Sequence, residues 1–205
     1  TDHGRRGICF WWDVLCRERR RAGASPRSVA REESLLMGMK SPAIEDYLLR
    51  HFGPDSMRPL SDVDRPFTCD EVRSLAGDPL LHWGNHTHSH AILTNYPPAE
   101  IREEVRTAAG DILAMTGRAP LSLAYPSGAF SPTVQAAVRE TGMETCLTTR
   151  PGKNRLPLAS AHRLQLRRFP VKGDRDVAEQ CEVICSSLRP FSWALDVIKR
   201  LRDGY

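Results

Sequence analysis

The sequence lacks a long apolar run and lacks a paired cysteine motif. No stretch approaches the ~18 apolar residues that a membrane helix needs, so we expect no membrane span. The six cysteines contain no C-x-x-C pair, and a chain of 205 residues can bury a core that needs no disulfides. Reduced cysteines in a cytoplasmic protein are therefore expected.

The N-terminal segment does not have the order of a signal peptide. Its cluster of arginines follows the short apolar stretch ICFWW, whereas a signal peptide places its basic residues first. The sequence begins without a methionine, so an export signal upstream of Thr1 is the alternative to the cytoplasmic location.

The charge balance is too mild to indicate a polyanionic partner. The net charge is +4, and basic residues gather at positions 17–21 and 163–168. No stacking aromatic residues or nucleic-acid motif accompany these clusters, so we interpret them as solvated helix faces and expect no nucleic-acid binding. The oligomeric state is left open.

Two cysteines and two histidines outside the main cluster are given structural interpretations. Cys181 and Cys185 are spaced i, i+4, which predicts neighbouring core thiols, with a metal pair as the alternative. His51 is expected on a helix and His82 inside a strand.

Helices and strands alternate regularly from residue 67 onward. Helices are expected at 68–77, 97–117, 131–142, 174–187 and 191–203, and strands at 79–85, 121–125, 144–149 and 164–171. The first of these helices opens with a capping box, Thr68 and Glu71, and the third with Ser131 as N-cap. This alternation predicts parallel β/α units in a single domain over residues 1–205.

The N-terminal third follows a different pattern. A helix with an apolar start and a basic end is expected at 8–23. Residues 25–65 contain two weak helical patterns and a loop rich in Gly, Pro, Ser and Asp, without a convincing strand. We interpret residues 25–65 as an inserted helical and loop region packed on the core.

The chemistry is expected where strands end. In α/β folds, binding residues gather at the carboxyl edge of the parallel sheet. Two polar segments, GNHTHSH and YPSG, follow directly after expected strands.

Three histidines lie within five positions of the first of these segments. Imidazole is the commonest ligand for zinc, and a helical turn after Asn85 would place His86 and His90 on one face. We therefore predict that these two bind a metal and that His88 points elsewhere, while Thr87 and Ser89 fix the turn. Ordinary polar residues in a surface loop are the alternative.

These segments resemble the polysaccharide deacetylase family, also known as the NodB-homology domain. The resemblance lies in GNHTHSHAIL, in AYPSGAFSPTVQAAVRETGMETCLTTRPGKN, in LRRFPV and in FWWDVL, and it covers most of residues 8–172. It implies a deformed (β/α) barrel that carries a metal-dependent hydrolase. Such enzymes remove acetyl groups from N-acetylated sugars of polysaccharides or oligosaccharides.

The resemblance also implies roles for individual residues. His86 and His90 match the two histidine ligands of a divalent metal, most simply zinc. The backbone N–H of Ser127 falls where the family stabilises an oxyanion, and its neighbours Tyr125, Pro126 and Gly128 are expected to contact substrate. His162 is the one downstream histidine that could act as the acid.

The sequence departs from the family pattern in three places. The family motif T-F-D-D-G, which supplies the base and the third ligand, is not present. Asp2 and His3 in TDHG resemble it, but their spacing from FWWD favours a loop position. Ala124 replaces an orienting arginine, and the late L-x-H motif is not recognisable. The base and the third ligand are therefore not assigned.

Two functions follow from these observations. One is a deacetylase, of which the chain is an N-terminally incomplete part or a C-terminal part of a longer enzyme. The other is a catalytically inactive, carbohydrate-binding pseudo-enzyme. Because base catalysis is worth about 10²–10⁴-fold, we expect weak zinc binding and little turnover without the carboxylates. The sequence does not identify the polysaccharide, and the region 25–65 is where selectivity is expected.

Overall fold

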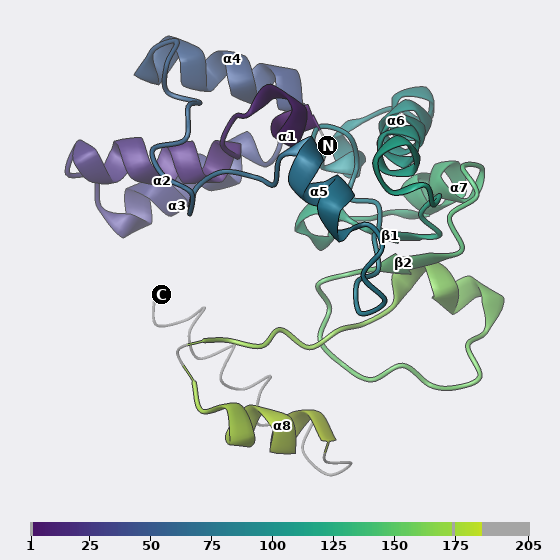
Figure 1. Ribbon diagram of the computed structural model, residues 1–205. Coiled ribbons are helices and arrows are strands. Elements are labelled where there is room, and N and C mark those ends of the chain that lie inside the picture. Colours follow the sequence, from purple (N-terminus) through teal and green to yellow (C-terminus); the bar gives the residue numbers. More distant parts are fainter. Residues whose placement is uncertain (1, 174, 186–205) are drawn as a thin grey trace.

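The computed structural model describes residues 2–173 and 175–185, and helices make up most of it (Figure 1). The helices are α1 (Asp2–Arg6), α2 (Trp11–Arg21), α3 (Pro26–Leu36), α4 (Ser41–Phe52), α5 (Cys69–Leu75), α6 (Pro98–Thr116), α7 (Pro132–Arg139) and α8 (Val177–Cys185). Short 3₁₀ helices are η1 (Leu93–Asn95), η2 (Pro126–Gly128) and η3 (Ser160–Gln165). The expected helix at 191–203 lies outside the described residues.

The sheet is small and parallel. Strand β1 (Ser122–Ala124) pairs with β2 (Thr145–Leu147), with Leu123 opposite Cys146. Single parallel bridges extend it on both sides, from Asn85 to Leu123 and from Leu147 to Leu166. The predicted α/β class with parallel strands is confirmed.

Two expected strands are reduced to these single bridges. Over 79–85 the chain makes a turn in which the N–H of Leu81 donates to the carbonyl of Asp78, and Leu80 and Leu81 are exposed. Over 164–171 the first positions belong to η3. An apolar run predicts a buried strand only if a neighbour covers it, and here no strand in the described part of the chain covers the outer side of residues 79–83.

The helix boundaries follow local signals. The hydroxyl of Thr68 accepts from the N–H of Glu71, whose carboxylate accepts from the N–H of Thr68, which confirms the capping box of α5. Ser131 caps α7 through the N–H of Val134. Gly117 ends α6 with a φ of 71°, a left-handed conformation that glycine adopts without strain.

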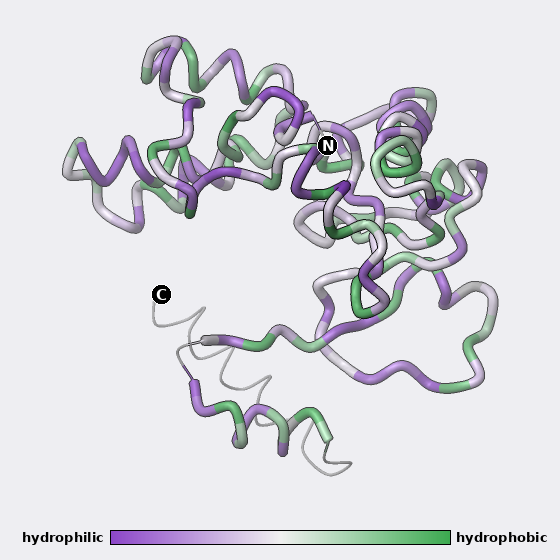
Figure 2. Tube along the Cα trace, viewed as in Figure 1, coloured by the Kyte–Doolittle hydropathy of each residue, from purple (hydrophilic) through white to green (hydrophobic). Residues whose placement is uncertain are grey.

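The described residues contain two clusters of buried apolar side chains. One lies between the sheet, α6 and α7, and includes Ile101 and Val105 of α6. The other lies among α2, α3 and α4, which stand apart from the sheet in Figure 1, and includes Val14 and Leu48. Figure 2 shows hydrophobic stretches alternating with hydrophilic ones along these helices. The helical region therefore includes α2, and it has a core of its own.

Polar contacts join the two parts. The side-chain amide of Asn95 donates to the carbonyls of Met37 and Met39, each at 2.9 Å. The phenol oxygen of Tyr96 accepts from the N–H of Ser41 at 2.7 Å. The connection between α3 and α4 is thereby fixed close to the segment that follows the histidines.

Helix α8 lies away from the sheet (Figure 1), and its thiols differ from expectation. Cys181 and Cys185 are both exposed, so the prediction of core thiols is wrong. The i, i+4 spacing did place them on a helix, which makes polar contacts from Gln180 to the backbone of Lys172 and Arg175. Among the described helices, none combines the length and apolar character needed to cross a bilayer.

Candidate functional site

The loop that follows Asn85 has an unusual backbone. Thr87 and His90 have φ values of 66° and 55°, a region that costs non-glycine residues about 1–3 kcal/mol each. Side chains stabilise it: the amide oxygen of Asn85 accepts from the N–H of Thr87, and the hydroxyl of Thr87 accepts from the N–H of Ala91 at 2.7 Å. The loop is therefore neither the helix nor the strand weighed from the sequence.

This backbone brings the imidazoles of His86 and His90 together. Their ring centroids are 4.8 Å apart and their planes are nearly perpendicular, at 80°. Nδ1 of His86 donates to the carbonyl oxygen of Ala124 at 2.6 Å. Because a carbonyl can only accept, the proton is on Nδ1 and the lone pair of His86 is on Nε2.

His90 is held by aromatic contacts. Its ring centroid lies 4.5 Å from that of Trp12 and 6.1 Å from that of Phe10. Nδ1 of His90 is buried and has no hydrogen-bond partner in the part of the chain that the structure describes. An unpaired polar atom in a buried position is costly, which marks this nitrogen as a site for a ligand.

Partial desolvation lowers the pKa values of both imidazoles and so favours their neutral forms. Desolvation lowers the pKa of His90 to about 3, with further lowering by the charges of His86 and His3. Desolvation also lowers the pKa of His86, opposed by the Ala124 carbonyl and assisted by the nearby guanidinium of Arg168. A neutral imidazole is the form that binds a metal.

The two histidines line a pocket of about 240 Å³. His3, Phe10, Trp83 and His88 also line it. The indole N–H of Trp83 is buried without a hydrogen-bond partner among the described residues, as is Nδ1 of His90. Trp83 was not predicted as a site residue from the sequence. Its position two residues before Asn85 is the sequence feature that could have indicated it.

His3 of the TDHG segment lines this pocket. Residues 2–4 belong to α1 and not to the expected loop, and the N–H of Asp2 donates to the carbonyl of His88 at 3.2 Å. Desolvation lowers the pKa of His3 to about 4, although the charge of Asp2 opposes this. The separation of this segment from FWWD along the sequence did not predict its placement, because segments far apart in sequence can pack together.

The expected turn 125–128 is present at the end of β1, and Ser127 has a φ of 55°. Gly128 approaches Thr149 so closely that an added Cβ would lie 2.1 Å from its hydroxyl oxygen. Tyr125 is buried, and its phenol donates to the carbonyl of Leu164 at 3.0 Å, so its side chain supports the core. The residues of the turn are not among those that line the 240 Å³ pocket.

The remaining histidines lie outside this pocket. His162 is exposed on η3. His51 stacks on Tyr47 within α4, as a structural histidine should. His82 is exposed and contacts the hydroxyl of Ser122, in irregular backbone and not in the expected strand.

The donor set of His86 and His90 fits a metal ion in part. The lone pair on Nε2 of His86 and the unpaired Nδ1 of His90 are what a divalent ion requires. Over residues 2–173 and 175–185, however, no group of three His, Cys, Asp or Glu side chains is arranged to hold a metal. The pair would supply two ligands, and the described residues bring no third such side chain into place.

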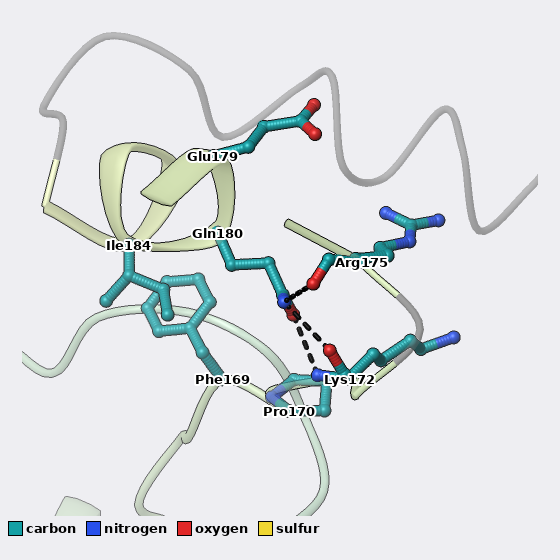
Figure 3. A pocket seen from close by; sticks show the side chains of 7 residues that line it. All are labelled: Phe169, Pro170, Lys172, Arg175, Glu179, Gln180 and Ile184. Atoms are coloured by element: carbon teal, nitrogen blue, oxygen red, sulfur yellow. Dashed lines mark hydrogen bonds between the residues drawn. The ribbon is translucent and has the colours of Figure 1, made fainter. Parts of the chain in front are cut away.

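A second cavity lies beneath α8 (Figure 3). The side chain of Gln180 closes it by bonding both the N–H and the carbonyl of Lys172. Its volume is about 40 Å³, enough for little more than water, and it contains none of the residues singled out from the sequence.

The comparisons with known proteins agree with this geometry. The sequence model described as polysaccharide deacetylase matches residues 45–146. No curated protein matches the chain at a significant level.

Solved structures share the fold. A polysaccharide deacetylase of Bacillus cereus is 19% identical, with a TM-score of 0.53 over 71% of this chain and 48% of that one. A deacetylase of Streptococcus pyogenes, solved with acetate, is 16% identical, with a TM-score of 0.52 over 60% and 53%. The chain thus spans about half the length of the solved structures it matches. With the family match over about half of its residues, the chain belongs to the polysaccharide deacetylase family.

Proposed function

We propose that the chain is a deacetylase domain that removes acetyl groups from N-acetylated sugars of a polysaccharide or oligosaccharide. The observation that carries the proposal is the His86–His90 pair, with ring centroids 4.8 Å apart and Nδ1 of His86 fixed by Ala124. This pair lies within the residues that the family model matches. We further propose that the sheet forms part of a deformed (β/α) barrel.

In this proposal His86 and His90 hold a divalent metal, with zinc as our candidate. His3 lines the same pocket and is the candidate third ligand, although the three side chains do not form a metal-binding group in the described residues. Such an ion supplies Lewis-acid activation of water and of an acyl carbonyl. The residues themselves supply orientation: Ala124 fixes one ring, and Trp12 and Phe10 fix the other.

The family resemblance also suggests roles for residues of the turn and of η3. The backbone N–H of Ser127 is our candidate for the oxyanion donor, since the strained turn exposes it at the end of β1, next to the carbonyl that binds His86. His162 remains the candidate acid; η3, which carries it, is bonded to that turn through Tyr125 and Leu164. Tyr125 and Pro126 are both buried and support the turn, which leaves Gly128 as the proposed substrate contact.

A carbohydrate-binding pseudo-enzyme is the second candidate. It is favoured by one observation, that the described residues present no three-ligand metal group. A binding protein would keep the pocket and its aromatic lining without turnover.

Acetate release from an N-acetylglucosamine oligomer separates the two functions. The metal-depleted chain is assayed with and without added zinc, beside His90→Ala and the matched control His51→Ala, which removes an exposed imidazole that does not line the pocket. Zinc-dependent release that His90→Ala abolishes and His51→Ala retains supports the deacetylase. Binding of the oligomer with no acetate release supports the pseudo-enzyme.

A further inference from the structure

A buried carboxylate beside the histidine loop is not explained by the proposed ligands. Asp111 lies on α6, on the same stripe as the core residues, and its side chain is 8% exposed. Burying an unpaired carboxylate is costly, so we expect Asp111 to be paired, and its partners indicate its role.

Asp111 joins three segments that are distant in sequence. Nδ1 of His88, in the histidine loop, donates to one carboxylate oxygen at 3.1 Å. Nη2 of Arg5, in α1, lies 2.5 Å from the other oxygen. Each oxygen therefore holds a different segment against α6.

The loop side of this network is firmly anchored. The N–H of His88 donates to the carbonyl of Glu104 at 3.1 Å, and both the N–H and the hydroxyl of Ser89 donate to the carboxylate of Glu104. The position of the loop on α6 thus does not depend on α1.

Helix α1 is also held from its other side, where Arg6 bonds to the carboxylate of Glu45 on α4 and the ring of His3 stacks on that of Phe10. Its described part is little more than one turn and contains no buried residue. Helices shorter than ~12 residues are marginal unless other contacts hold them. Its contacts to the loop and to α6 are polar: Arg5 with Asp111, the N–H of Asp2 with the carbonyl of His88, and Asp2 Oδ1 at 3.9 Å from Nε2 of His88.

We propose that Asp111 is a positioning residue, which docks α1 on the histidine loop and so keeps His3 in the pocket of His86 and His90. The bond to His88 fixes the loop, and the ion pair with Arg5 fixes the helix that carries His3. The docking is independent of the proposed function. Its consequence for metal affinity rests on that function.

The test uses Arg5→Gln as its main variant, because Arg5 is half exposed and its loss does not threaten the core. Arg5→Lys keeps the charge, Asp111→Asn removes the carboxylate charge, and His51→Ala is the control. Amide hydrogen exchange of residues 2–7 reports docking, and zinc titration of the metal-depleted chain reports the pocket.

Loss of a charge-assisted bond worth about 1.5 kcal/mol should speed exchange of α1 roughly tenfold in Arg5→Gln and Asp111→Asn. Arg5→Lys should restore most of the protection, and His51→Ala should leave it unchanged. Unchanged exchange in Arg5→Gln overturns the docking role. This readout needs no metal, so it decides the docking even if the proposed function fails.

Zinc affinity tests whether docking of α1 serves the metal pocket. Delivery of His3 by the docked helix predicts affinity that is lower by roughly tenfold in Arg5→Gln and recovered in Arg5→Lys. Faster exchange with unchanged zinc affinity would show that α1 does not serve the metal pocket. A wild-type chain that binds no zinc refutes both the link between docking and zinc affinity and the proposed metal site.

Discussion

Nδ1 of His86 donates to the carbonyl oxygen of Ala124 across 2.6 Å, which ties the histidine loop to the end of β1. The backbone carbonyl orients the His86 ring, and the lone pair on Nε2 is left for a ligand. This bond depends on the parallel bridge between Asn85 and Leu123, because that bridge sets the loop beside the strand.

Asn85 should be essential to the loop. It is 1% exposed, and its amide donates to the carbonyl of Val105 and accepts from the N–H of Thr87. Asn85→Ala leaves a buried donor unsatisfied, so we expect the free energy of unfolding to fall by about 1–3 kcal/mol in urea titrations. Asn95→Ala, which removes an amide from the surface contact with Met37 and Met39, should cost less. Equal losses would contradict the central role of Asn85.

The turn that contains Gly128 should tolerate no side chain. Gly128 has a φ of 68°, and an added Cβ would lie 2.1 Å from the hydroxyl oxygen of Thr149. We expect Gly128→Ala to destabilise the fold by roughly 2–4 kcal/mol, from positive φ plus overpacking. Gly142→Ala is the matched control, because φ there is 85° with open space, so only about 1–2 kcal/mol should be lost. Thermal unfolding of the two variants compares them directly.

Stability should decrease on mild acidification of the metal-free chain. The pKa values of His90 and His3 are lowered to about 3 and about 4, whereas an unfolded histidine titrates near 6.5. Below about pH 6.5 the unfolded state therefore binds more protons than the folded state, and the free energy of unfolding falls with pH. Urea unfolding between pH 7.5 and 5.5 measures the slope while carboxylates stay ionised. The slope should shrink in His90→Gln, and a slope of the opposite sign would refute the assignment.

The cysteines should divide by reactivity. Cys181 and Cys185 are exposed on α8, while Cys9 and Cys146 are buried and their thiols have raised pKa values, about 11 for Cys146. Only the thiolate reacts. Maleimide labelling of the native chain, mapped by mass spectrometry, should modify the first two rapidly and the last two only in denaturant. Rapid native labelling of Cys146 would be inconsistent with its place in the core.

The sequence predicted elements with strong local signals. The capping box at Thr68, the Ser131 cap and the spacing of the α6 stripe all depend on neighbours within one turn, and each was confirmed. The strands at 79–85 and 164–171 were overestimated because their pairing depends on distant segments. The sequence likewise did not predict that Cys181 and Cys185 are exposed, because burial of a helix face depends on which distant segments cover it.

The candidate site was predictable only where residues of one type lie close together in the sequence. The pair His86 and His90 was visible as a motif, and the geometry brings the rings together by a backbone that the motif does not encode. The convergence of His3 on the same pocket, and of Arg5 and His88 on Asp111, depends on tertiary packing. No local pattern could reveal these.

Zinc stoichiometry tests the central claim most directly. The metal-depleted chain, His86→Ala, His90→Ala and the control His51→Ala are each titrated with zinc by calorimetry. The account predicts one zinc per chain in the wild type and in His51→Ala, and loss of that binding in each of the other two variants. Binding that survives both pocket substitutions, or no binding by the wild-type chain, would contradict it.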